Sequence, residues 1–345
     1  MDSAYQRTFR IVISFHWCIT SGYAMPTAPQ HTPSEKHLLA RLRFRHLQLI
    51  AEVERVGSLS KAAAALSLTQ PAMSKALKEI ESMLGFSLFT RGARGLQKTA
   101  QGAIVMHGAT LILKELLHMQ AEADAAGPDG RVAATLRIGT GAFLAVSLVP
   151  RVIAHLLACD PPVRVTLREA YVPSLFAELL EGNLDALITV YDADAMAATA
   201  DRGIRFEKFA EEDYAVIVPA GHRLARKRKV AWKELTPEPW VLTRKPSLAR
   251  VFIEDTFRRE GLAPPLPFCE TESPVTSARI VAEGVGVSCT PDSTATEAER
   301  SGRVKRLRMQ TPPPSATLGL VYRSAAQSHP RIQLLRAALA AIGDE

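Results

Sequence analysis

Apolar residues recur at helical spacing in three short segments between residues 44 and 84, which predicts three consecutive helices. The first covers 44–57, where Gly57 can end a helix, and its apolar residues are Phe44, Leu47, Ile50 and Val53. The second covers 58–67, with four alanines and with Ser58 or Ser60 as its N-terminal cap. The third covers 69–84, with Thr69 as its cap and Pro71 in its first turn.

A short hairpin and a long helix are expected next. Residues 86–98 combine apolar residues with two glycines beside Arg91 and Arg94, as in a two-stranded hairpin with a basic tip. From Thr99 onward, apolar residues alternate at spacings of four and three: Val105, Ala109, Ile112, Leu116, Met119, Ala123 and Ala126. This heptad seam favours pairing with the same helix of a second copy, and packing on its own domain is the alternative. The segment GPDG at 127–130 then marks a domain boundary.

Beyond residue 130, strand-like and helical segments alternate, which predicts parallel β-sheets covered by helices. Two such sets indicate two small α/β subdomains, the first over about 131–210 and 316–342 and the second over about 211–315. The predicted strands are 135–139, 163–168, 186–191, 214–219, 267–271, 286–290 and 316–323, and the predicted helices are 143–158, 173–183, 247–260, 274–284 and 330–342.

Positive charge is concentrated near the N-terminus. Residues 36–101 contain eleven basic and four acidic residues, an excess equal to the net charge of +7 of the whole chain. A basic module on an otherwise neutral chain is typical of nucleic-acid-binding proteins. The four cysteines are isolated, so neither a zinc site nor a disulfide framework is indicated, and a reducing cytoplasm fits this usage. No apolar run approaches the roughly 20 residues of a membrane-spanning helix.

The predicted third helix has an apolar side and a polar side. Gln70, Ser74 and Lys78 recur every four residues on the polar side, and Lys75 lies beside them. Amide, hydroxyl and ammonium groups can contact base edges and phosphates in the major groove of double-stranded DNA, which the N-terminal end of such a helix enters. A helix-turn-helix motif is therefore expected, with phosphate contacts from Arg43, Arg45, Arg91 and Arg94. The alternative is an ordinary polar face of a small helical bundle.

The stretch from Phe44 to Gly102 closely resembles the LysR-type transcriptional regulators. The matching segments are FRHL, GSLSKAAAAL, TQPAMSKALKEIE, LGFSLFTR and KTAQG, and the likeness extends over about residues 38–342. The resemblance implies an α+β multidomain protein, with a winged helix-turn-helix over 38–98, a linker helix over 99–127 that pairs two protomers, and a periplasmic-binding-protein-like α/β effector domain of two subdomains over 131–342. Members are usually cytoplasmic homotetramers built from two homodimers.

The resemblance also assigns residues to the two sites. The family's DNA-reading positions fall on Gln70, Pro71, Ser74 and Lys75, and the full DNA-binding set expected here is Ser58, Ser60, Thr69, Gln70, Pro71, Ser74, Lys75, Lys78, Arg45, Arg91 and Arg94. Ligands of α/β sheets bind beyond the carboxyl ends of strands, which agrees with the family's effector position between the subdomains. The expected effector-binding set is Thr140, Gly141, Phe143, Tyr171, Val172, Thr243 and Ser247.

The effector class stays open between a sugar and an aromatic acid. The FRHL opening and the RG dipeptide at the hairpin tip resemble a subgroup that regulates the catabolism of such compounds. Phe143 and Val172 stand where some relatives carry hydroxyl residues, which weakens the case for a carboxylate ligand. The alternative for Thr243 and Ser247 is that they only cap a helix.

Other functional classes are less well supported. No nucleophile elbow, phosphate loop or metal-ligand cluster suggests an enzyme, a cofactor or a metal. A solute-binding protein with a non-functional N-terminal segment would not account for the basic helix-turn-helix. Residues 1–37 are expected to be disordered or a mis-set gene start, and the alternative is a targeting segment. The basic run RKRK at 226–229 is interpreted as a solvated loop, and the alternative is a second DNA site. RNA polymerase is a further candidate partner.

Overall fold

The computed structural model describes residues 38, 40–92, 95–124, 135–158, 163–191, 203–245 and 247–343. They form two compact units, one up to residue 124 and one from residue 135, and each is considered by itself. The expectations for residues 1–37, for Arg94 and for Ala126 lie outside the described residues, and only the backbone of Arg91 is described.

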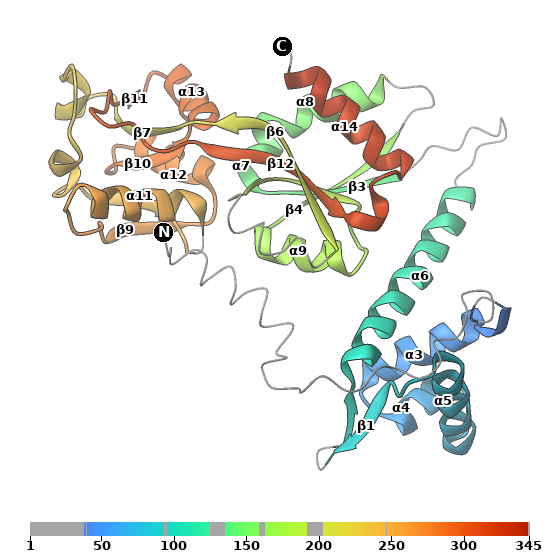
Figure 1. Cartoon of the computed structure of the whole chain (residues 1–345). Helices are drawn as coiled ribbons and strands as arrows, with labels where there is room; N and C mark the ends of the chain where they lie inside the picture. The colour runs from blue at the N-terminus through green and yellow to red at the C-terminus, as the bar shows by residue number, and fades with distance from the viewer. Residues whose placement is uncertain are drawn as a thin grey trace. The chain divides into compact units, whose positions relative to one another are not determined.

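Three helices form the core of the N-terminal unit: α3 (Phe44–Val56), α4 (Leu59–Ala65) and α5 (Gln70–Leu84) (Figure 1). Gly57 and Gly85 follow α3 and α5 in the left-handed conformation, with φ of 66° and 80°, which glycine adopts without steric cost. Of the two candidate caps of α4, Ser58 is the one that accepts the N–H of Lys61. Phe44, which recurs at helical spacing with Leu47, Ile50 and Val53, is exposed, whereas Leu49 is buried.

A two-stranded antiparallel hairpin and a long helix complete this unit: β1 (Phe89–Gly92), β2 (Gly95–Lys98) and α6 (Ala100–Asp124). The carboxylate of Glu81 in α5 accepts the N–H of Leu88 at 2.7 Å, and the side chain of Leu88 is fully buried. These contacts fix the start of the hairpin against the three-helix core.

Some residues of the heptad seam of α6 pack on their own domain, and others are exposed and could pair with a second copy. Ala109 is buried in the core of its own unit, and Val105 packs against that core. Farther along the same seam, Ile112 and Met119 are 48% and 59% exposed. The first two seam residues therefore pack within the unit, and the later ones leave an apolar strip available to a partner.

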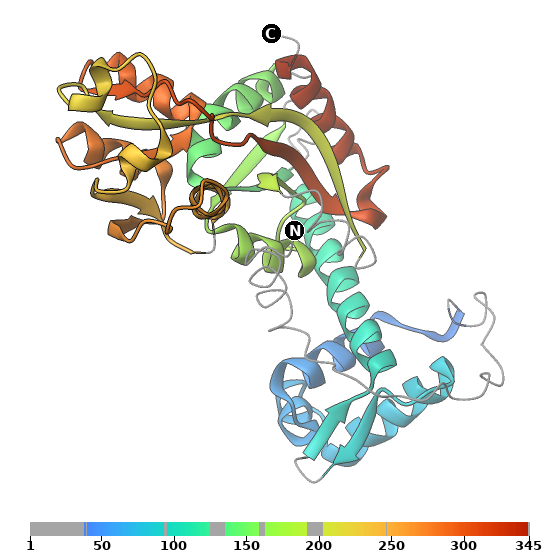
Figure 2. The same cartoon turned by 60° about the vertical axis from the view of Figure 1, so that its left-hand side comes forward.

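The second unit begins with a five-stranded sheet in the order β4-β3-β5-β12-β6. We call this sheet and the helices that pack on it subdomain I. Helices α8 and α14 cover one face of this sheet and α9 covers the other (Figures 1 and 2). Its strands are β3 (Thr135–Thr140), β4 (Arg164–Glu169), β5 (Ala186–Tyr191), β6 (Ile204–Glu212) and β12 (Ala316–Arg323), and its helices are α7 (Ala142–Ser147), α8 (Val149–Leu157), α9 (Val172–Leu180), the short η4 (Ser324–Ala326) and α14 (Pro330–Gly343).

Two expectations about subdomain I are corrected. The sheet is mixed and not parallel, because β12 runs antiparallel to both β5 and β6 as the chain returns from subdomain II. The helix expected over 143–158 is split at Leu148 into α7 and α8. Pro150 explains the split, because it has no N–H to donate and its ring conflicts with the carbonyl four residues earlier.

Subdomain II contains two small sheets, β10-β7-β11 and β8-β9. The first sheet is antiparallel, because β7 runs antiparallel to both β10 and β11, which corrects the expectation of parallel sheets. Among the described residues of subdomain II, only β8 with β9 and the two isolated bridges are paired in parallel. Its elements are β7 (Tyr214–Pro219), η2 (Arg223–Arg226), η3 (Trp232–Leu235), β8 (Trp240–Thr243), α11 (Leu248–Arg259), β9 (Pro267–Thr271), α12 (Pro274–Ala282), β10 (Ser288–Pro291), α13 (Asp292–Arg300) and β11 (Val304–Arg306).

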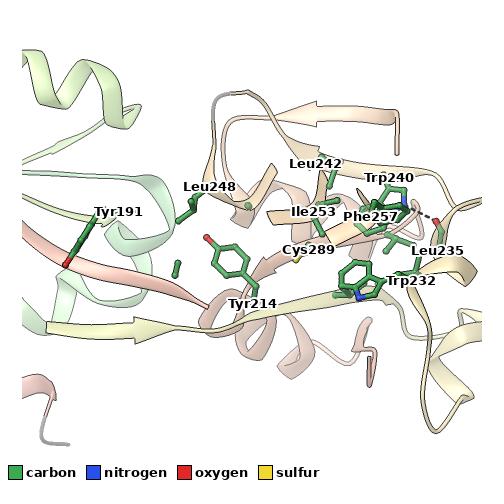
Figure 3. Close-up of a cluster of buried hydrophobic side chains, with 14 of the residues drawn as sticks. Tyr191, Tyr214, Trp232, Leu235, Trp240, Leu242, Leu248, Ile253, Phe257 and Cys289 are labelled. Atoms are coloured by element: carbon green, nitrogen blue, oxygen red, sulfur yellow. Dashed lines mark hydrogen bonds between the residues drawn. The ribbon is translucent and has the colours of Figure 1, made fainter. Parts of the chain in front are cut away.

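One apolar cluster extends through both subdomains (Figure 3). It runs from Tyr191 at the end of β5 to Tyr214 and Leu248, and ends at Trp232, Trp240 and Phe257. The buried indole N–H of Trp240 donates to the carbonyl of Leu235 at 3.0 Å, so this polar group is satisfied. The subdomains therefore share a core. Among the described helices, none combines the length and apolar character that crossing a bilayer requires.

Candidate nucleic-acid interface and effector site

Helix α5 presents a polar face opposite its buried one. Met73, Leu77 and Ile80 are buried in the core, while Gln70, Lys75 and Lys78 are exposed. The amide nitrogen of Gln70 donates to the hydroxyl of Ser74 at 3.3 Å, so the two side chains lie together on one side of the first turn. The structure thus brings the predicted reading residues of α5 onto one accessible surface.

The two predicted hydroxyl residues that precede α4 and α5 have structural roles. Thr69 accepts the N–H of Ala72 at 3.3 Å and Ser58 accepts that of Lys61 at 3.5 Å, so both act as helix caps. Pro71 lies in the first turn of α5 and is exposed, and Ser60 is exposed in α4. These contacts fix where α5 begins and how its first turn faces solvent.

Two ion pairs reduce the positive charge elsewhere in this unit. Arg55 pairs with Glu52 and lowers the pKa of that carboxyl, mainly by hydrogen bonding, and Lys98 pairs with Glu54 at 2.8 Å. Lys75 and Lys78 form no ion pair with the described residues. Their ammonium groups are therefore available for an external polyanion, as is the exposed Arg45.

In subdomain I, the candidate effector residues differ in accessibility. The hydroxyl of Thr140 is fully buried and donates to the carbonyl of Ile188 at 2.8 Å. Phe143 is likewise buried, in the apolar core of subdomain I. Gly141 and Tyr171 occupy the N-cap positions of α7 and α9, and Val172 is the first residue of α9.

Tyr171 lies near charged residues of subdomain II. It is 39% exposed, and burial raises its pKa to about 12, with Arg244 acting against this shift and Glu272 adding to it. The phenol therefore stays neutral at pH 7 and can both donate and accept a hydrogen bond. Arg244 follows β8 and Glu272 follows β9, so the carboxyl ends of these strands lie near Tyr171.

In subdomain II, Thr243 and Ser247 form a hydroxyl pair with oxygens 2.6 Å apart. Ser247 also accepts the N–H of Arg250 at 3.2 Å, so Ser247 caps α11. The turn between β8 and α11 is thus held by side-chain hydroxyls at both of its ends.

A charged network beside this turn was not expected from the sequence. The buried carboxylate of Glu254 forms ion pairs with Lys245 at 2.8 Å and with Arg250 at 2.7 Å. Arg250 also forms an ion pair with Glu270 at 2.9 Å. Burial acts to raise the pKa of Glu254, but these cations lower it overall. The i, i+4 spacing of Arg250 and Glu254 is a sequence signal that could have indicated part of this network.

Comparisons with known proteins match both units. The model of the "Bacterial regulatory helix-turn-helix protein, lysR family" covers residues 44–103, and that of the "LysR substrate binding domain" covers 129–343. The chain is 32% identical to the HTH-type transcriptional regulator GbpR of Azospirillum brasilense over 263 residues, which is 75% of each chain. It is 27% identical to the regulator PcaQ of Agrobacterium fabrum over 306 residues, 87% of this chain and 94% of that protein.

Solved structures show the same fold. A full-length OxyR variant from Pseudomonas aeruginosa aligns with a TM-score of 0.56 and 22% identity over 87% of this chain and 95% of that one. CrgA, a LysR-type transcriptional regulator from Neisseria meningitidis, aligns with a TM-score of 0.52 and 21% identity over 88% and 100%. Because the helix-turn-helix family model matches residues 44–103, the alternative of a solute-binding protein with a non-functional N-terminus is wrong. The chain belongs to the LysR family of DNA-binding transcriptional regulators, which are not enzymes, and it carries that family's effector-binding domain.

Proposed function

We propose that this protein is a sequence-specific transcription regulator that acts in the cytoplasm, reads duplex DNA with α5, and is controlled by a small molecule bound between its two subdomains. The observation that supports DNA reading most directly is the exposed face formed by Gln70, Ser74, Lys75 and Lys78. An amide can pair bidentately with adenine, and ammonium groups can reach guanine or phosphate. As in other helix-turn-helix dimers, two copies would place their α5 helices in successive major grooves.

Lys75→Ala tests this assignment. We expect a loss of affinity for the promoter duplex of about 5- to 150-fold, since one good base contact is worth roughly 1–3 kcal/mol. Arg55→Ala is the matched control, because Glu52 already balances the charge of Arg55. Affinity is measured by fluorescence anisotropy of labelled promoter DNA over a salt series. Equal affinities of the two variants would contradict the role given to Lys75.

For the effector, the hydroxyl-bearing residues Tyr171, Thr243 and Ser247 are the best supported contacts. The first lies at the start of α9 and the other two flank the turn before α11, so they belong to different subdomains. A ligand that contacts both sides would favour one relative arrangement of the subdomains and thereby shift the population of DNA-binding states.

The charge balance at this place favours a neutral, hydroxyl-rich effector such as a sugar over an aromatic acid. The cations at the ends of β8 and α11 already have carboxylate partners: Arg244 pairs with Glu272, Lys245 with Glu254, and Arg250 with Glu254 and Glu270. A bound carboxylate would have to displace one of these pairs and leave a carboxylate without its cation, at a cost. A sugar needs only the hydroxyl and phenol groups already present.

Calorimetry with neutral hexoses and pentoses, and with benzoate and its hydroxylated derivatives, tests this choice. We expect a neutral sugar to bind and Thr243→Val to weaken its binding at least about tenfold, because a polar group of the ligand would lose its partner. Lys75→Ala should bind the same sugar as the wild type does. Binding of an aromatic acid alone would reverse the effector assignment without affecting DNA recognition.

A further inference from the structure

Four exposed cations lie together on subdomain II, outside the sites described so far. Arg226, Arg228 and Lys229 lie at and after the end of η2, and Arg308 follows β11. Val230 forms a parallel bridge with Met309, and the N–H of Val230 donates to the carbonyl of Arg308 at 2.9 Å, which places Lys229 beside Arg308. We call these four residues the basic loop surface.

The loop that carries this surface is firmly anchored. Leu224, Val230 and Trp232 are buried in the large apolar cluster, and the indole N–H of Trp232 donates to the carbonyl of Thr311 at 2.9 Å. The segment lies at the end of subdomain II away from subdomain I (Figures 1 and 2, yellow). The backbone that carries the four cations is therefore held in place by the packing beneath it.

The neighbouring cations of the loop are neutralised and these four are not. Arg223 pairs with Glu238, and Lys227 pairs with Glu234, whose pKa is lowered chiefly by the hydrogen bond from Lys227. Within the described residues, none of the four cations of the basic loop surface forms an ion pair. Like charges held side by side repel one another, and a partner with closely spaced negative charges relieves that repulsion.

Duplex DNA is the partner that fits this surface best. Its backbone carries one negative charge per roughly 1.7 Å of helix axis. The family binds DNA through the helix-turn-helix of its N-terminal unit, and a second contact tethered to the first acts at an effective concentration on the order of millimolar where the linker lets both reach the DNA. An acidic protein would have no such advantage.

We propose that the basic loop surface is a second, sequence-independent contact with the DNA backbone flanking the site that α5 reads. This goes beyond base recognition by the N-terminal unit, and it rests on the proposed function, since α5 must first bring the DNA to the protein. The effector domain then contributes directly to DNA affinity, and a ligand that moves subdomain II alters that contribution.

The test compares two full-length variants of equal net charge. One is R226Q/R228Q/K229Q/R308Q, and the other is the scattered control R164Q/R205Q/R259Q/R279Q, whose four arginines are exposed on other parts of the effector domain. Binding to promoter DNA with long flanks is measured at several salt concentrations, and thermal unfolding confirms that both variants fold. The double variant R228Q/K229Q provides an intermediate step.

We expect the slope of log affinity against log salt to become shallower by about 0.9 for each DNA phosphate that the variant no longer neutralises, with the double variant in between. The scattered control should keep the wild-type slope. Trimming the flanks to the bare site should abolish the difference between the variants.

Equal slopes for the quadruple variant, the control and the wild type would overturn the proposal. An equal decrease in both quadruple variants would also overturn it, because only general charge would then matter. Absence of promoter binding by the wild-type protein would instead refute the proposed function itself, so the two failures are distinguishable.

Discussion

At the residue scale, two glycines of α6 show how position decides the effect of one methyl group. A Cβ on Gly102 would lie 2.0 Å from the backbone carbonyl oxygen of Leu88, whereas a Cβ on Gly108 would meet nothing within 4 Å. The N–H of Gly102 also donates to the hydroxyl of Thr99 at 2.8 Å, so Thr99 caps the start of α6. The close approach of the hairpin to α6 therefore requires glycine at 102 and tolerates a side chain at 108.

We predict that Gly102→Ala lowers the free energy of unfolding of the N-terminal unit by about 1–3 kcal/mol, because the backbone around Leu88 must move. Gly108→Ala should leave it unchanged or raise it by up to about 1 kcal/mol, since alanine favours the helix. Thermal and urea unfolding of the two variants measures this contrast. A Gly102→Ala protein as stable as Gly108→Ala would show that the contact between the hairpin and α6 is looser than described.

At the scale of elements, Glu207 joins β6 to α14. Its carboxylate receives two hydrogen bonds from Arg336, each 2.7 Å long, and a third from the buried hydroxyl of Tyr322. Hydrogen bonding by Arg336, opposed by burial and aided by Tyr322, lowers the pKa of Glu207. The edge strand β6 is rich in charged residues and was missed in the sequence, and this polar contact helps to keep it in the sheet.

We predict that Glu207→Gln lowers the stability of the effector domain at pH 7 by about 1 kcal/mol, a modest value because the pair is partly open to solvent. Since the pKa of Glu207 in the folded state lies below its ordinary value of 4.5, this stabilisation is complete above pH 4.5 and is lost as the pH falls through the folded value. The difference between wild type and variant should therefore shrink on acidification. Urea unfolding at pH 7 and at decreasing pH tests this, and a difference that grows toward low pH would refute it.

At the scale of the whole molecule, the chain consists of a DNA-binding unit and an effector-binding unit, and we propose that the exposed strip on α6 is the surface through which two copies pair. Ile112 and Met119 continue the seam that begins with the packed residues Val105 and Ala109. An exposed apolar strip on a long helix is stabilised by pairing with the same strip of a second copy. Paired copies would also present two α5 helices to one DNA site.

We predict that the double variant I112E/M119E is shifted toward monomer and loses affinity for promoter DNA by at least about tenfold, because one α5 helix binds without its partner. Leu117→Glu is the control: Leu117 is 62% exposed on the same helix but lies off the seam. Sedimentation equilibrium measures the assembly state and anisotropy measures DNA affinity. An unchanged oligomer in the double variant would place the assembly interface elsewhere.

The sequence alone determined the features that depend on local pattern and chemistry. Helices α3, α4, α5 and α6, with their glycine and hydroxyl ends, follow from periodicity and capping, and the polar face of α5 follows from the spacing of Gln70, Ser74 and Lys78. These features depend on residues within a few turns of one another, so a single segment contains the information. The basic character of the N-terminal part is likewise a property of composition.

Tertiary structure decided whatever depends on partners distant in the chain. The reversed direction of β12, the burial of Thr140 and Phe143, and the ion pair between Arg250 and Glu270 arise from contacts between segments that no local pattern links. Tertiary structure also decides which charges are paired. The four residues 226–229 are all basic in the sequence, but in the folded chain Lys227 pairs with Glu234. Among the described residues, no carboxylate pairs with Arg226, Arg228 or Lys229. Local pattern specifies which faces are apolar or charged, whereas burial and the pairing of charges are set only when distant segments meet.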